Sequence, residues 1–374
     1  MRALLLCLGL AALSACSAVP TGVPDGPRPA FTAATDADRA AGADRFPVEV
    51  LGRWGYIDRT GALVIAPQFD AARPFREGRA AVRSREGWGF VDPGGRLAVA
   101  PVWDEVSDFA EGRARVATRT ETALRKGFVD AEGRRVLPVE ALEAYDFAGG
   151  LAPVQQLARY APLRLRWLRP FGVADTGPWT LVGADGRVRT TLDATAVAAG
   201  SALADGRLLF PVQVKVGLLS TRRWGFADGE GRLAIPARFE AAGRFAEGLA
   251  PVAEGGRFGF VDPEGALQVA PRFDAAMAFS DGRARVRLGA LWGYVYPDGS
   301  LAAEPAWDAA LDASEGLAAV QRDGLWGYLG PDGAIALPLR YAFAAPFQNG
   351  LALVRDADGL AYIDTEGDVV WRGD

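Results

Sequence analysis

A short motif returns along this chain at a fixed spacing. It consists of an aromatic residue, glycine, a second aromatic residue, an aliphatic residue and, in most copies, aspartate. From Trp224 onward it starts every 34 residues, at Phe258, Trp292, Trp326 and Leu360. A fixed period of this size indicates a repeat architecture, in which each copy is one small structural unit. The sequence therefore predicts a series of similar units rather than one irregular domain.

Nine copies of the motif can be recognised within residues 46–374. The fourth copy has no glycine after Trp179, and the spacing is longer around it, which indicates an insertion at about residues 155–222. The copies start at Trp54, Trp88, Lys126, Trp179, Trp224, Phe258, Trp292, Trp326 and Leu360.

Each copy has the pattern of β-structure. Its apolar runs are short, rich in aromatic and β-branched residues, and bounded by Gly, Pro and Asp. In the copy that starts at Phe258, the turn at 262–265 can join two strands. We expect Pro271 to end the second of them, because proline has no N–H for a ladder hydrogen bond. The predicted unit is a three-stranded antiparallel meander that buries its rings against its neighbours.

The glycine of the motif should mark a place where a neighbouring ring or backbone comes close, or where a strand bulges. Glycine weakens a strand on entropic grounds, so such a constraint has to explain its presence. We therefore expect valine at Gly225 to destabilise the fold far more than a change at an exposed strand site.

The predicted fold class is all-β, with about nine three-stranded units in an open or superhelical, solenoid-like array. Propeller blades usually have about four strands, and closed rings usually have about four to eight blades. The first and last copies also look complete, which leaves no strand to join the two ends. A closed, propeller-like ring is the alternative.

The repeats resemble the bacterial WG-repeat family, which is named for its Trp-Gly pair, over nearly the whole of residues 46–374. The shared pattern is Trp-Gly-aromatic-aliphatic-Asp, a turn glycine, Pro-x-aromatic-acid and Phe-x-acid-Gly. This chain departs from it at Lys126, at Trp179 and at Leu360-Ala361. The resemblance implies an all-β repeat scaffold without a shared catalytic residue, usually regarded as an interaction surface.

Residues 1–15 have the layout of a signal peptide, with Arg2 ahead of an apolar run too short for the roughly 20 residues of a membrane-spanning helix. The end of this run, Leu13-Ser14-Ala15-Cys16, resembles the lipobox of bacterial lipoproteins. The resemblance implies cleavage before Cys16 and attachment of diacylglycerol and palmitate there. Ser17 in the next position would favour the outer membrane. An ordinary signal peptide with an incidental Cys16 is the alternative.

Residues 16–45 are rich in Pro, Ala, Gly, Thr and Asp and are predicted to be a flexible tether between the lipid and the repeat domain at 46–374. The expected location is the cell envelope, on the periplasmic or surface face of a membrane. Cys7 and Cys16 are the two cysteines of the chain, so the repeat domain has no disulfide and must be held together by packing.

The insertion carries the candidate partner-binding residues. In an extended strand Arg164 and Arg166 would lie on the face opposite Trp167, and Arg169 follows them. Arginine suits an anionic partner, so we predict a docking site for a protein or an envelope polymer. A solvated hairpin whose arginine stems cover apolar surface is the alternative. The formal net charge of −5 argues against nucleic acid.

Composition excludes most catalytic machinery. The chain has no histidine, so neither a Ser-His-Asp triad nor an imidazole metal site can form. Paired carboxylates, as in a glycosidase, are the remaining route to catalysis. Glu140, Glu143 and Asp205 are the acids outside the repeat register that could form such a pair.

Most acids instead recur at one position of the motif, as turn residues do. Each loop offers a single acid, far from the roughly six to eight oxygen ligands that Ca²⁺ takes. We therefore predict a scaffold without catalysis, metal or cofactor. A carbohydrate-active enzyme, or a carbohydrate-binding protein that uses carboxylates and exposed aromatic residues, is the alternative. The recurring aspartates are Asp58, Asp92, Asp130, Asp228, Asp262 and Asp364.

Overall fold

The computed structural model of this protein describes residues 44–121, 123–157, 176–192, 204–216, 219–230 and 232–373. All the regular secondary structure of these residues is β-strand, which confirms the expectation of an all-β fold. The same residues contain no helix that is long and apolar enough to cross a membrane.

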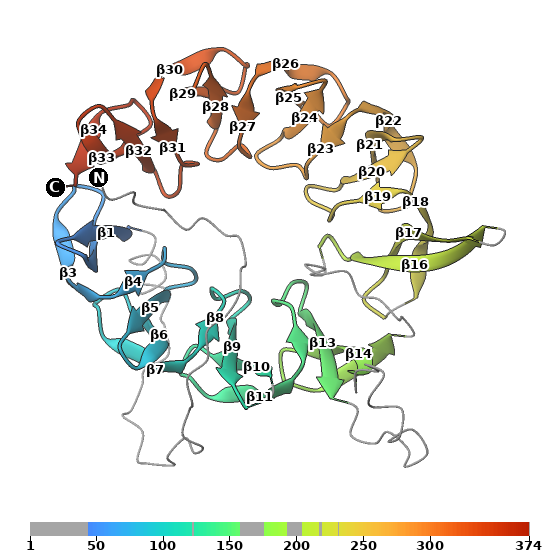
Figure 1. Ribbon diagram of the computed structural model, residues 1–374, viewed down its shortest axis with the longest axis horizontal. Helices are drawn as coiled ribbons and strands as arrows, with labels where there is room; N and C mark the ends of the chain where they lie inside the picture. Colours follow the sequence, from blue (N-terminus) through green and yellow to red (C-terminus); the bar gives the residue numbers. More distant parts are fainter. Residues whose placement is uncertain are drawn as a thin grey trace.

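The strands form nine small antiparallel sheets that follow one another around a ring (Figure 1). We number the sheets 1 to 9 along the chain, and each contains one predicted copy of the motif. In the described part of the chain seven sheets have four strands, and sheets 1 and 5 have three. The fold is a β-propeller. The closed-ring alternative is confirmed, and the expectation of an open array is wrong.

Each four-stranded sheet has a two-residue strand nearest the centre of the ring (Figure 1). The prediction of three strands per unit missed it, because two residues, mostly alanine, are too few to show a strand pattern. With this strand counted, the units have the size of ordinary propeller blades. The innermost strands are β4 (Ala71–Ala72), β8 (Glu105–Val106), β12 (Glu143–Ala144), β19 (Ala241–Ala242), β23 (Ala275–Ala276), β27 (Ala309–Ala310) and β31 (Phe343–Ala344).

The next two strands of each sheet form the hairpin that contains the motif. The first member of the hairpin is β1 (Phe46–Val50), β5 (Ala80–Ser84), β9 (Arg113–Arg119), β13 (Leu151–Leu157), β16 (Leu208–Val216), β20 (Ala250–Glu254), β24 (Ala284–Leu288), β28 (Ala318–Arg322) or β32 (Ala352–Asp356). The second member carries the start of the motif, and is β2 (Arg53–Ile57), β6 (Gly87–Val91), β10 (Leu124–Asp130), β14 (Thr176–Gly183), β17 (Leu219–Ala227), β21 (Arg257–Val261), β25 (Leu291–Val295), β29 (Leu325–Leu329) or β33 (Gly359–Ile363).

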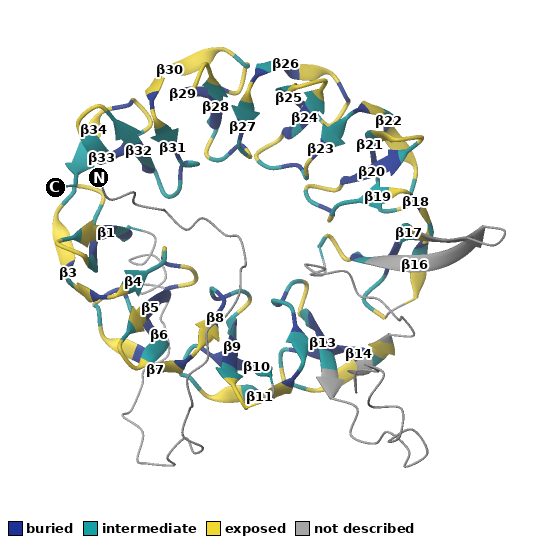
Figure 2. Ribbon diagram, in the orientation of Figure 1, coloured by how far each residue is buried: buried dark blue, intermediate teal, exposed yellow. Residues whose placement is uncertain are grey.

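The outermost strand of each sheet is an exposed edge (Figure 2). Pro271 lies inside such a strand, β22 (Leu267–Phe273), so the expectation that it ends the strand is wrong. Its nitrogen lies against Gly259, where β22 bulges, and a bulge tolerates proline because its extra residues make no ladder hydrogen bond. The edge strands are β3 (Leu63–Phe69), β7 (Leu97–Trp103), β11 (Arg135–Ala141), β15 (Val188–Leu192), β18 (Leu233–Phe239), β22 (Leu267–Phe273), β26 (Leu301–Trp307), β30 (Ile335–Tyr341) and β34 (Val369–Arg372).

The glycine of the motif sits where the edge strand bulges against it. A Cβ on Gly225 would lie 2.7 Å from the carbonyl oxygen of Ile235 and 2.8 Å from the nitrogen of Ala237. All seven sheets with this glycine have a register shift in the edge strand at this point. The two sheets with Thr180 or Ala361 instead pair regularly there. Close approach of backbone and a bulge are thus the constraint on this glycine.

Rings from neighbouring sheets pack edge to face and form the core between them. Phe90 of sheet 2, for example, meets Phe109 of sheet 3 with ring centroids 4.8 Å apart, and both side chains are buried. This confirms that aromatic burial between units holds the fold together. The same contact recurs at Tyr56–Phe75, Phe128–Phe147, Phe226–Phe245, Phe260–Phe279 and Tyr328–Phe347.

Sheets 9 and 1 close the ring with the same kind of contact. Phe46 of β1 packs on Tyr362 of β33 with centroids 5.6 Å apart, and the Tyr362 hydroxyl donates to the carbonyl oxygen of Pro47 at 3.0 Å. Burial raises the pKa of this hydroxyl. The last strand is held by Arg372, which donates two hydrogen bonds to Asp356 at 2.7 and 2.9 Å. Closure therefore uses side chains and needs no shared strand.

Candidate functional site

The loops that follow the innermost strands form an inner rim to the ring (Figure 1). Each of these inner-rim loops ends in a pair made of one residue, usually acidic, and glycine. In the loop of sheet 3 these are Glu111 and Gly112, with φ values of 52° and 71°. Two successive residues in the left-handed region point their backbone amides to one side, which creates a concave site for an anion.

The acid of one loop fills the amide site of the next. Glu77 of sheet 2 accepts hydrogen bonds from the amides of Glu111 and Gly112 in sheet 3, at 2.8 and 2.7 Å. We call each such contact a carboxylate clamp. The clamps run from Glu77 to Glu111 and Gly112, from Glu111 to Gly149 and Gly150, from Asp205 to Gly248, from Glu247 to Gly282, from Asp281 to Gly316, and from Glu315 to Asn349 and Gly350.

The acid-glycine pair was visible in the sequence, but its role was not. The signal was present, since the pair recurs along the repeats and glycine follows an acid in most of them. What the sequence could not show is that the acid reaches the next sheet. Charge-assisted hydrogen bonds of this kind are among the stronger polar contacts in proteins, so the clamps hold adjacent sheets in position at the inner rim.

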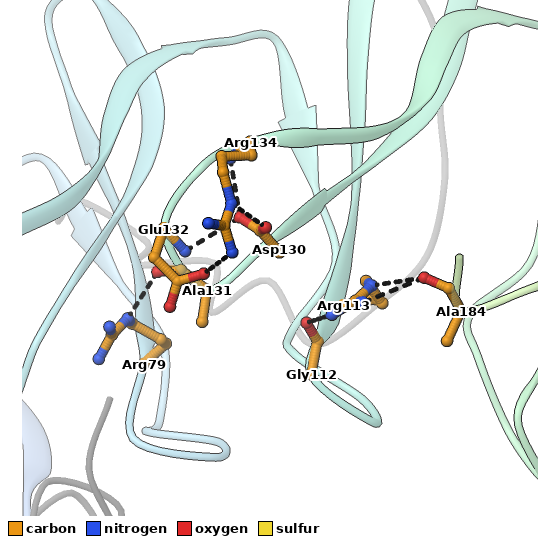
Figure 3. A network of polar contacts seen from close by, with 8 residues as sticks. All are labelled: Arg79, Gly112, Arg113, Asp130, Ala131, Glu132, Arg134 and Ala184. Atoms are coloured by element: carbon orange, nitrogen blue, oxygen red, sulfur yellow. Dashed lines mark hydrogen bonds and ion pairs between the residues drawn. The ribbon is translucent and has the colours of Figure 1, made fainter. Parts of the chain in front are cut away.

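Arginine residues after some of these pairs make a second link between sheets (Figure 3). Arg79 of sheet 2 is 2% exposed and donates from Nε to the carbonyl oxygen of Ala131 in sheet 3, at 3.2 Å. Arg113 of sheet 3 reaches Ala184 of sheet 4 in the same way, at 3.1 and 3.0 Å. Both arginines therefore satisfy carbonyl groups in a turn of the following sheet.

The recurring aspartates cap turns, as the sequence predicted. Asp58 accepts hydrogen bonds from the amides of Thr60 and Ala62 at 2.9 and 3.1 Å. The hydroxyl of Thr60 also donates to it, and this bond is the main reason that the pKa of Asp58 is lowered. The same capping occurs at Asp92, Asp130, Asp228, Asp262 and Asp364.

Of the three acids expected to lie outside the repeat register, Asp205 in fact occupies the acid position of the inner-rim pair in sheet 5, so that expectation is wrong for it. Glu140 lies in β11, whereas Glu143 lies in β12 of the next sheet and forms an ion pair with Lys126. Asp205 accepts a hydrogen bond from the amide of Gly248 at 2.8 Å. In the residues that the structure describes, no group of three or more acids or thiols could hold a metal ion.

The tryptophans of the motif lie half-buried at the opposite end of the hairpins from the inner-rim loops. Arginine side chains lie over Trp88 and Trp292. The guanidinium of Arg73 lies 4.8 Å from the ring centroid of Trp88, and Arg285 lies 5.4 Å from that of Trp292. Such contacts stabilise the ring and the cation together. Trp179, in one of the two sheets that lack the motif glycine, is instead buried, at 7% exposed, and stacks on Tyr145.

A shallow cleft of about 500 Å³ opens between sheets 1 and 2. Arg53, Gln68, Arg85 and Glu86 contribute its polar lining, and Phe69 and Leu97 contribute apolar surface. Arg53 also forms an ion pair with Asp70 beside it.

The predicted lipidation site Cys16 and the predicted partner-binding residues Arg164, Arg166, Trp167 and Arg169 lie outside the described residues. At the end of the predicted insertion, Arg223 is described and forms an ion pair with Glu240 at 3.5 Å.

A family model described as "WG containing repeat" matches this chain at six places that together make up more than half of it. No curated protein matches the chain in sequence. The matched residues are 54–86, 88–118, 224–257, 258–292, 292–326 and 326–359.

Several solved structures share the fold at low sequence identity. A eukaryotic initiation factor is 9% identical with a TM-score of 0.59, over 87% of this chain and 94% of that chain. PorZ, a surface component of the type-IX secretion system of Porphyromonas gingivalis, is 12% identical with a TM-score of 0.34, over 87% of this chain and 51% of that one. AztD of Citrobacter koseri is 9% identical with a TM-score of 0.41, over 87% and 92%. At such identities the likeness to the initiation factor shows the propeller fold alone.

Proposed function

Because this chain belongs to the family of WG containing repeat proteins, we propose that it is a binding scaffold of the cell envelope. It holds a protein or an envelope polymer and catalyses no reaction. The lipid at Cys16 fixes it to a membrane, with the outer membrane the favoured one, and the tether at 16–45 carries the propeller away from the lipid surface.

The main support for this proposal is that the recurring carboxylates form hydrogen bonds with backbone amides. The turn aspartates bind backbone amides within their own turns, and the inner-rim acids bind amides of the next sheet. These carboxylates recur at backbone contacts, whereas a general acid or base is positioned against its substrate. Together with the absence of histidine from the sequence, this favours a framework that presents surfaces over one that performs chemistry.

Capture of a partner tests the scaffold proposal. We expect the tagged full chain to retain a specific protein from solubilised envelope, or to sediment with purified cell walls. The test variant replaces Arg164, Arg166 and Arg169 together by glutamine, and the wild-type chain is its control. It should keep the melting temperature of the wild type and lose most of the captured material, because the guanidinium groups would contact an anionic partner.

Two results would contradict parts of this proposal. If the wild-type chain retains neither a protein nor cell wall above the level of an unrelated propeller, the scaffold function is wrong. If the glutamine variant captures as much as the wild type, the docking site lies elsewhere on the chain.

Replacement of Cys16 by alanine tests the membrane anchor. The thiol is the point of lipid attachment, so the variant should move from the membrane pellet to the soluble fraction and should no longer incorporate labelled palmitate. A Cys7→Ala variant is the matched control and should stay in the pellet. Equal partition of the Cys16 variant and the wild type would rule out the anchor.

A further inference from the structure

The series of carboxylate clamps is interrupted between sheets 4 and 5. In sheet 4 the position of the acid is taken by Gly149, which has no carboxylate to offer. Sheet 5 nevertheless keeps the acid-glycine pair, at Asp205 and Gly206. Their φ values of 47° and 71° match those of Glu111 and Gly112, whose amides bind Glu77. The amide site of sheet 5 is thus preformed in the same way as the clamped ones.

Among the described residues, no oxygen accepts a hydrogen bond from the amides of Asp205 and Gly206. Both residues are exposed, and a Cβ added to Gly206 would meet nothing within 4 Å. The Asp205 carboxylate does not fill its own amide site, because it is directed at Gly248 of sheet 6, 2.8 Å away. No described residue therefore occupies the two amides.

The six clamps of the same ring identify the chemistry of that group. Each fills this kind of amide site with a carboxylate at N–O distances from 2.5 to 3.0 Å. Three of the clamping glutamates, Glu77, Glu111 and Glu315, contact both amides of the pair. Glu247 and the clamping aspartates, Asp205 and Asp281, contact the glycine amide alone. Every clamp that reaches both amides is made by a glutamate.

We propose that the amides of Asp205 and Gly206 form a binding site for a glutamate side chain of an acidic partner peptide. The site reproduces between two molecules the clamp that the chain makes six times within itself. This inference rests on the proposed scaffold function and names a second docking point, at the inner rim, in addition to the arginines predicted for the insertion. The equivalent amides of Glu77 and Gly78 are less suitable, because Gly78 is buried.

The matched variants are Gly149→Glu and Gly149→Gln. Gly149 has a φ of 59°, close to the 52° to 55° at which Glu77, Glu111 and Glu315 stand, so both side chains fit the backbone. Glutamate at this position supplies the missing clamp from sheet 4 and should occupy the amides of Asp205 and Gly206. Glutamine has the same size without the charge and should leave the site available.

The measurement is an amide NMR titration of the ¹⁵N-labelled full chain. The probe is the capped peptide acetyl-Gly-Glu-Gly-amide, and the peptide with glutamine in place of glutamate is its control. We expect the glutamate peptide to shift the Asp205 and Gly206 resonances in the wild type and in Gly149→Gln. The glutamine peptide should bind about tenfold more weakly, since a charged acceptor makes the stronger hydrogen bond. In Gly149→Glu both resonances should be displaced without peptide and should not respond to it.

The inference is overturned if the glutamate peptide leaves both resonances unmoved in the wild type, or if Gly149→Glu responds as the wild type does. Equal shifts with inorganic phosphate and with the glutamate peptide would also overturn it, because the site would then bind any anion. These failures differ from failure of the scaffold function. A chain that captures its envelope partner but ignores the peptide remains a scaffold with a different docking point.

Discussion

Valine in place of Gly225 is expected to lower the free energy of unfolding by about 3 kcal/mol or more. The new Cβ would lie 2.7 to 2.9 Å from the backbone of Ile235 and Ala237, closer than real Cβ contacts come. Backbone atoms of a paired strand cannot move aside as a flexible side chain can. The sheet would have to lose its bulge, and the edge strand would lose its register. Thermal and denaturant unfolding measure the change.

The matched control is Leu233→Val, which places the same residue in the edge strand of the same sheet. Leu233 is 57% exposed, and exposed substitutions usually change stability by no more than about 0.5 kcal/mol. Equal melting temperatures for the two variants would contradict our account of the motif glycine. In sheets 4 and 9 the edge strand pairs regularly at this position, and Thr180 and Ala361 take the place of the glycine.

Alanine in place of Phe46 should destabilise the protein by about 3 to 5 kcal/mol, the usual cost of truncating a buried phenylalanine. Phe46 is 4% exposed and packs on Tyr362 across the junction of sheets 1 and 9. The cavity would lie at the point where the ring closes. Hydrogen exchange of the β1 and β33 amides should therefore quicken more than that of sheets 6 and 7.

Two controls separate closure from general destabilisation. Tyr362→Phe keeps the ring contact and removes the hydrogen bond to Pro47, so it should cost only about 1 kcal/mol. Leu63→Ala changes a side chain of sheet 1 that is 52% exposed and should have little effect. If Phe46→Ala behaves like Leu63→Ala, or if exchange rises equally in all sheets, the contact between sheets 1 and 9 does not hold the ring closed.

The inner rim shows most clearly what tertiary structure adds to a recognised pattern. The acid-glycine pair is visible in the sequence at Glu77, Glu111 and Glu247. Its meaning depends on a contact between sheets, because the carboxylate binds amides 34 or more residues further on. The consequence of Gly149 is likewise invisible without the ring, since a glycine pair in a turn looks ordinary by itself.

The role of the turn aspartates was predictable because their contacts are local. Asp58 and Asp262 bind amides two and four residues ahead in their own turns. A contact of that range is fixed by local sequence, so the motif was enough to predict it. The prediction for Pro271 was wrong because the effect of proline depends on whether it lies at a regular pair or in a bulge, which only the strand pairing decides.

The sequence by itself determined the repeat, the number of units, the β-structure of each hairpin and the need for glycine after the motif aromatic. These follow from period, residue type and local backbone preference. Only the tertiary structure decided that the array closes, that most sheets have a fourth, two-residue strand, and that acids of one sheet clamp the next. The physical reason is the range of the contacts: closure depends on how each sheet packs on its neighbour, repeated over nine sheets until Phe46 meets Tyr362.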